Sequence, residues 1–182
     1  MSCLPFAVVL GLFLSVWGTD KNPEGFDKKQ FCNDLKVILA TFSESPDSLT
    51  AQLNGTNSLG MQEWSVRMVL PGAVQGALYR TPQGEGEEQR LVYLMAEDIP
   101  QSQADNLYKE LVQLIRGCLG SVYGLHESVT SEWDETGKRL DHRNAVFTAR
   151  ESMSGQEVQL QVTTFAVVSG RFSVTVEVTV VR

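Results

Sequence analysis

The last segment of the chain alternates strictly between apolar and polar residues. Side chains in a β-strand point alternately to the two faces of a sheet, so this pattern predicts a strand with one covered face and one wet face. A sheet with an apolar face needs a second layer to cover it. The apolar positions, all within residues 172–180, are Phe172, Val174, Val176, Val178 and Val180.

Two segments have the helical spacing that a covering layer requires. The first helix is predicted over 27–42, with Asp27 as its N-cap. The second is predicted over 103–119, with Ser102 as its N-cap and Gly120 ending the helix. Each has a single apolar stripe. The first stripe is Phe31, Leu35, Ile38, Leu39 and Phe42, and the second is Leu107, Leu111, Leu114, Ile115 and Cys118.

The remaining strands complete an α+β pattern. Segments 43–62 and 121–143 are interpreted as a polar loop and a connector. The sequence predicts a two-layer α+β fold, with a mainly antiparallel sheet of about six strands and two helices on one face. The predicted order is helix, three strands, helix, three strands. Besides the last strand, the predicted strands are 62–70, 73–80, 90–97, 144–150 and 157–165.

The N-terminus carries an uncharged apolar run over residues 4–17. As a helix this run would span about 21 Å, which is short for a hydrocarbon core of about 30 Å. Its length suits a signal peptide, with Gly18 in a small-residue cleavage site. We therefore expect residues 1–18 to be a signal peptide and 19–182 to be a single α+β domain, exported to a periplasm or the extracellular space. An uncut membrane anchor and a buried N-terminal helix are the alternatives.

Cleavage after Gly18 would remove Cys3 and leave Cys32 and Cys118. Two cysteines in an oxidising compartment predict a disulfide between them. The alternative is two buried free thiols, which pack like small apolar side chains. A bridge would bring the start of the first helix to the end of the second. If the helices also lay side by side, they would run antiparallel.

Charge and motifs argue against several classes of function. The chain has 15 Lys and Arg against 22 Asp and Glu, a net charge of −7, and no basic cluster, so we expect no nucleic-acid partner. It contains no phosphate-binding glycine motif and no G-x-S-x-G nucleophile elbow. With only two histidines and a paired set of cysteines, we expect no metal site and no cofactor.

Four residues of the 121–143 connector are candidates for a site. The hypothetical catalytic residues are His126, His142 and Asp134. The alternative is that they are solvent-exposed loop residues without a catalytic role, which is the commoner case for such a pattern. Trp133 lies outside any periodic pattern and is a hypothetical binding anchor, because exposed tryptophans often contribute strongly to interfaces.

The sequence therefore favours an exported, non-catalytic binding or interaction domain. Its partner is expected to be a protein or a small ligand, and a membrane only if the N-terminal segment stays uncut. The first alternative is a cell-envelope accessory or structural protein anchored by that segment. The second is a small hydrolase with a site in the 121–143 connector.

Overall fold

The computed structural model describes residues 27–83, 86–149, 157–168 and 170–181. The predicted signal peptide, 1–18, lies outside these residues. None of the helices described is long and apolar enough to cross a membrane.

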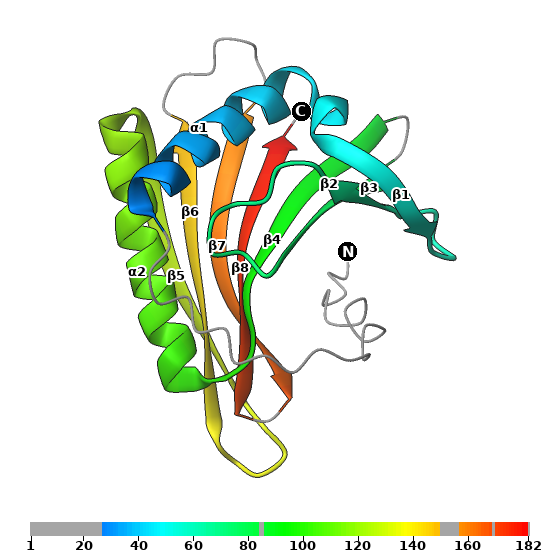
Figure 1. Ribbon diagram of the computed structural model, residues 1–182. Coiled ribbons are helices and arrows are strands. Elements are labelled where there is room, and N and C mark those ends of the chain that lie inside the picture. The colour runs from blue at the N-terminus through cyan, green and yellow to red at the C-terminus, as the bar shows by residue number, and fades with distance from the viewer. Residues whose placement is uncertain (1–26, 84–85, 150–156, 169, 182) are drawn as a thin grey trace.

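The described residues form one antiparallel sheet of eight strands with two α-helices on one side of it (Figure 1). The strands lie in the order β1-β2-β3-β4-β8-β7-β6-β5, so each half of the chain supplies four neighbouring strands and β4 pairs with β8 at the centre. In chain order the elements are α1 (Lys28–Glu44), the 3-10 turn η1 (Pro46–Leu49), β1 (Thr50–Thr56), β2 (Gln62–Val66), β3 (Gln75–Gln83), β4 (Gly86–Pro100), α2 (Gln101–Leu119), the 3-10 turn η2 (Gly120–Val122), β5 (Tyr123–Trp133), β6 (Arg139–Ala149), β7 (Glu157–Val168) and β8 (Arg171–Val181).

The predicted two-layer α+β fold is confirmed, and the sheet is larger than expected. The two added strands are β1 and β5, which lie in the segments interpreted as loop and connector. Both are edge strands, and most of their residues are exposed. A strand shows alternating apolar residues because one of its faces is buried. A strand that is exposed on both faces therefore has only a weak periodic pattern in its sequence.

The core lies between the helices and the sheet. The apolar stripe of α1 and the alternating residues of β8 from Phe172 to Val178 are buried as predicted, and Val180 is half-buried. The opposite face of β8 is drier than expected, because Ser173 is fully buried. It is a small residue paired with the larger Phe165 on β7, so its neighbours shield it.

The helix ends agree with the sequence in part. The Asp27 carboxylate accepts the backbone N–H groups of Lys29 and Gln30 at 2.8 and 3.1 Å, which confirms the N-cap. Gly120 ends α2 with a positive φ of 62°, as expected. The predicted Ser102 cap is wrong, because β4 runs directly into α2 and the helix begins at Gln101, two residues before the predicted start, with Pro100 at the N-cap position.

Cys32 and Cys118 form the predicted disulfide, with 5.1 Å between their Cα atoms. The bridge joins the start of α1 to the end of α2. The helices do not lie side by side, because α1 crosses the strands obliquely while α2 runs along them (Figure 1). The condition for an antiparallel helix pair is therefore not met. Closing a loop of 86 residues restricts the unfolded chain, and the chain-entropy relation gives about 4.5 kcal/mol of stabilisation.

Candidate functional site

The two edges of the sheet differ in how accessible they are to another strand. β1 has seven residues, and its pairing with β2 contains two register shifts. β5 has eleven residues and pairs with β6 without a shift from Tyr123 to Trp133. Bulges, prolines and lysines are the usual features that protect a sheet edge. β5 has no proline, lysine or arginine, so it is a long and regular edge.

The hydrogen-bonding direction along β5 follows from its hairpin turn. The backbone N–H of Asp134 donates to the carbonyl oxygen of Lys138 at 2.9 Å, so this pair is of the hydrogen-bonded kind. Such pairs alternate with non-bonded pairs in an antiparallel ladder. The even-numbered residues of β5 therefore point their backbone groups at β6. The odd-numbered residues point theirs away from the sheet: Tyr123, Leu125, Glu127, Val129, Ser131 and Trp133.

No strand among the described residues pairs with the outer side of β5, which ends the sheet. Val129, at the middle of the strand, is 52% exposed. β5 therefore presents a row of backbone donors and acceptors that an extended polypeptide segment could complete.

The side chains of the same odd-numbered residues face the helices. Glu127 accepts a hydrogen bond from the Tyr108 hydroxyl of α2 at 3.1 Å, and Leu125 packs against the core. Burial, together with the nearby Glu127 carboxylate, raises the pKa of Tyr108. The start of α2 is also tied to β6, since Arg143 Nε lies 2.6 Å from Asp105 Oδ1. Two polar contacts thus hold α2 over this side of the sheet.

A hollow of about 620 Å³ lies where α2 ends and β5 begins. Its apolar part comes from the sheet, and its charged groups are one guanidinium and one carboxylate. Tyr123 lines it and has a pKa raised by burial. The lining residues are Arg116, Gly120, Ser121, Tyr123, Leu125, Glu127 and Phe147.

A second hollow of about 440 Å³ shares Tyr123 with the first. It lies between α1 and the end of α2, next to the disulfide, and Val122 at its margin is 62% exposed. Its other lining residues are Lys36, Leu39, Ala40, Ser43, Cys118, Leu119 and Val158. Both hollows lie at the end of β5 that follows α2.

The structure does not gather the hypothetical catalytic residues. His142 on β6 pairs with Thr130, four residues from His126, which corresponds to about 13 Å along the strand. The Nε2 atom of His142 contacts the Glu132 carboxylate. Asp134 accepts hydrogen bonds from the backbone N–H groups of Thr136 and Lys138 and thus stabilises the hairpin turn. Each of the three side chains therefore lies in a different environment.

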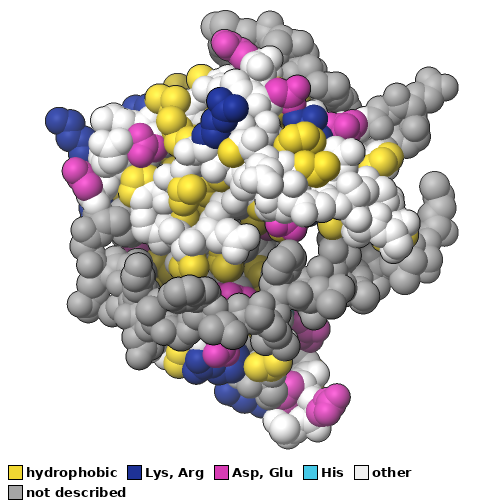
Figure 2. Space-filling model, turned by 45° about the vertical axis from the view of Figure 1, so that its right-hand side comes forward, with side chains coloured by type: hydrophobic (Ala, Val, Ile, Leu, Met, Phe, Trp, Pro, Cys, Tyr) yellow, Lys and Arg dark blue, Asp and Glu magenta, His cyan; other side chains and the backbone are white. Residues whose placement is uncertain are grey.

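Among the described residues, no group of three or more His, Cys, Asp or Glu side chains is placed to hold a metal ion. On the side of the molecule shown in Figure 2, Lys and Arg side chains lie among Asp and Glu side chains. Hydrophobic side chains on this side occur in small groups between polar atoms.

Trp133, the hypothetical anchor, lies at the end of β5 and is 71% exposed. It belongs to the row of odd-numbered residues, so it follows the alternation of Leu125 and Glu127. Sequence reasoning singled out this residue but missed the strand that carries it. The signal was a weak alternation, because Tyr123, Leu125, Val129 and Trp133 are apolar at odd positions while polar residues interrupt them.

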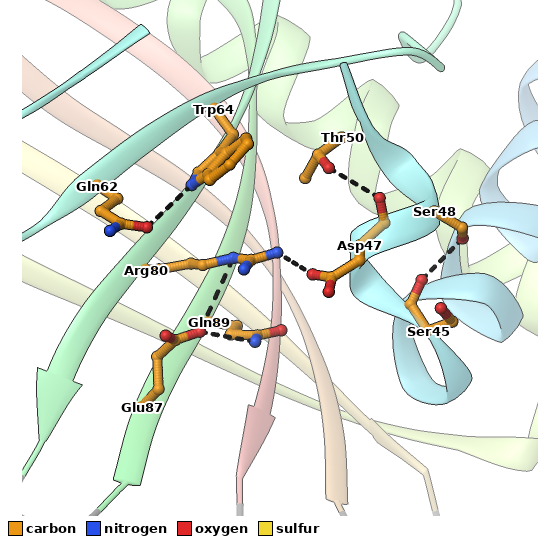
Figure 3. Close-up of polar contacts among 9 residues, drawn as sticks. All are labelled: Ser45, Asp47, Ser48, Thr50, Gln62, Trp64, Arg80, Glu87 and Gln89. Atoms are coloured by element: carbon orange, nitrogen blue, oxygen red, sulfur yellow. Dashed lines mark hydrogen bonds and ion pairs between the residues drawn. The ribbon is translucent and has the colours of Figure 1, made fainter. Parts of the chain in front are cut away.

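A cluster of polar side chains at the other end of the sheet connects the sheet to η1 (Figure 3). Arg80 of β3 places its guanidinium 5.2 Å from the ring centre of Trp64 on β2 and forms an ion pair with Asp47 of η1. The Arg80 side chain is only 16% exposed. Glu87 Oε1 lies 3.8 Å from Arg80 Nε. These contacts attach η1 to the sheet beside β1.

Comparison with protein-family models, curated proteins and solved structures finds no match to this chain. The assignment of function therefore depends on the geometry of the described residues.

The Arg80 cluster predicts a selective effect on stability. Replacing Arg80 with Met should lower the free energy of unfolding by about 1–2 kcal/mol, because the cation–π contact and the ion pair with Asp47 are both lost. Urea unfolding followed by circular dichroism measures this change. The exposed Arg67 on the adjoining loop provides the control, and Arg67→Met should leave stability unchanged. Equal effects of the two substitutions would contradict the structural role of Arg80.

Proposed function

We propose that this chain is an exported, non-catalytic interaction module that binds an extended polypeptide segment along β5. The observation that carries the proposal is the regular pairing of β5 on one side only. Eleven residues without a bulge present backbone groups in a straight row. A segment added there would gain main-chain hydrogen bonds, and its alternate side chains would give specificity.

The surroundings of β5 suit a bound segment. Side chains of the added strand would point alternately to the helix side and to the outer face of the sheet. On the helix side they would meet the hollow lined by Tyr123, Leu125 and Arg116, which offers apolar contact and one positive charge. Trp133, at 71% exposure, would cover the other end of the segment.

Export is the second part of the proposal. The disulfide between Cys32 and Cys118 supports an oxidising compartment, and the apolar run over 4–17 supports a signal peptide. The sequence-based alternatives, a small hydrolase and an anchored envelope protein, remain predictions. No observation at the described site favours either of them over strand binding.

Selection from a displayed library of random dodecapeptides tests the binding activity. We expect enriched peptides with alternating apolar residues that bind with micromolar affinity. Val129→Pro should weaken their binding at least tenfold, because proline removes an outward N–H group from the middle of the row. Titration calorimetry with individual enriched peptides measures this loss.

The control separates the edge from the fold. Ser128 points its N–H group at β6, so in dilute protein Ser128→Pro should lower the melting temperature, whereas Val129→Pro should leave it nearly unchanged. Failure to enrich any peptide, or equal peptide affinity in the wild-type and Val129→Pro proteins, would refute strand binding at β5.

Mass spectrometry of the secreted, non-reduced protein tests export. We expect an N-terminus at Thr19 and a mass that corresponds to one intact disulfide. The Gly18→Leu variant should be cleaved poorly, because signal peptidase requires a small residue before the cut. A wild-type protein that stays in the cell with residues 1–18 attached would contradict this part of the proposal.

A further inference from the structure

We propose that the segment bound by β5 is β5 of a second copy of this chain. The two strands would run antiparallel across a two-fold axis at Val129 and join two eight-stranded sheets into one. This inference rests on the proposed function, since it names the strand that the β5 edge receives. It follows from the directions of the backbone groups, the charges along the strand and the position of the hollow.

The hydrogen-bonding directions restrict the possible registers. Only the odd-numbered residues of β5 point their backbone groups outward, so odd-numbered residues must pair with odd-numbered residues of the second copy. The two-fold axis then passes through a residue position and never between two positions. Registers centred on Glu127, Ser128 and Val129 are the central choices.

The side chains that face each other across the axis distinguish these three registers. An axis at Glu127 places two Glu127 carboxylates directly opposite each other, which is destabilising. An axis at Ser128 places His126 opposite Thr130, and neither carboxylate of the strand then faces a side chain that donates a hydrogen bond. An axis at Val129 places the His126 imidazole, which carries an N–H donor, opposite the Glu132 carboxylate at two symmetric positions and Val129 opposite itself. Glu132 has acceptor positions for this contact besides the one that His142 of its own chain uses. The strand is therefore complementary to its own copy about Val129.

The same register accounts for the exposed tryptophan. With the axis at Val129, Leu125 faces Trp133 of the second copy, and directly opposite side chains lie on the same side of a sheet. That is the helix side, where Leu125 lines the hollow of about 620 Å³. The indole of the second copy would thus enter a space lined by Leu125 and Arg116. Two-fold symmetry repeats this contact at the other end of the interface.

The pairing also accounts for the difference between the two sheet edges. In the proposed dimer five odd-numbered residues of each β5, from Leu125 to Trp133, find hydrogen-bonding partners. Val129, at 52% exposure, and Trp133, at 71%, become covered. The irregular β1 is left at the two outer ends of the joined sheet.

Analytical ultracentrifugation of the full chain tests the association. We expect the wild-type protein to form a dimer at micromolar concentration. Val129→Pro should shift it to monomer, and Trp133→Ala should weaken association at least tenfold, with both variants retaining the wild-type circular dichroism spectrum. Leu59→Ala is the matched control, because Leu59 is 78% exposed near the opposite edge and should leave the dimer intact.

Cross-linking through introduced cysteines tests the register. In chains with Cys3→Ser, the variant Val129→Cys should form an intermolecular disulfide under mild oxidation, since opposite Cα atoms would lie about 5.5 Å apart. Glu127→Cys and Ser128→Cys should cross-link much more slowly.

Three results would overturn the inference: a monomer at up to millimolar concentration, a dimer insensitive to Val129→Pro, or faster cross-linking at position 127 or 128. A monomer that still binds selected peptides through β5 would refute the second copy as partner and leave the proposed function standing. A monomer that binds no peptide would refute both.

Discussion

An open β-sheet must end in two strands whose backbone groups are paired on one side only. This constraint governs the present structure, because its eight described strands do not close into a barrel and leave β1 and β5 at the margins. The helices cover the apolar face of the sheet, and no described strand pairs with the outer backbone groups of β5. At β1, seven residues with two register shifts form an irregular margin. At β5 the backbone groups stay in an uninterrupted row, which makes this edge the distinctive feature of the molecule.

The packing of α2 explains why the surface beside β5 has a hollow on its helix side. Tyr108 and Asp105 fix the first half of the helix to β5 and β6, and the disulfide fixes its last turn to α1. The helix then ends at Gly120, and the chain turns into β5 within three residues. The space below this turn is the larger hollow. The helix beside this hollow is thus held at both ends.

The sequence predicted the covered parts of the fold and missed the uncovered ones. The alternation around Val174 and Val176 and the apolar stripe of α1 both reflect burial, and they correctly predicted a strand and a helix. β5 was interpreted as connector, because most of its residues are exposed and burial imposes little pattern on them. Its N–H and C=O directions depend on register with β6, which a single sequence does not specify. Trp133 was predicted as a binding anchor because it lies outside any periodic pattern. Its position at the end of an exposed edge strand could be recognised only in the structure.

The disulfide, unlike β5, could be predicted from the sequence. The pairing could be predicted because two cysteines have one possible partner each, and the helix stripes placed both near the core. The antiparallel arrangement depended on the further condition that the helices lie side by side. That condition failed because α1 crosses the sheet obliquely (Figure 1). A disulfide fixes the distance between two points, and the angle between two helices is set by side-chain packing.

Residue-resolved amide hydrogen exchange distinguishes the inward from the outward backbone groups of β5. We expect the even-numbered amides of β5, such as those of Ser128 and Thr130, to be protected at every protein concentration. The odd-numbered amides, such as those of Glu127 and Val129, should exchange rapidly in dilute protein and become protected as the protein associates. Equal protection of odd and even amides in dilute protein, or odd amides that stay unprotected in concentrated protein, would contradict this expectation.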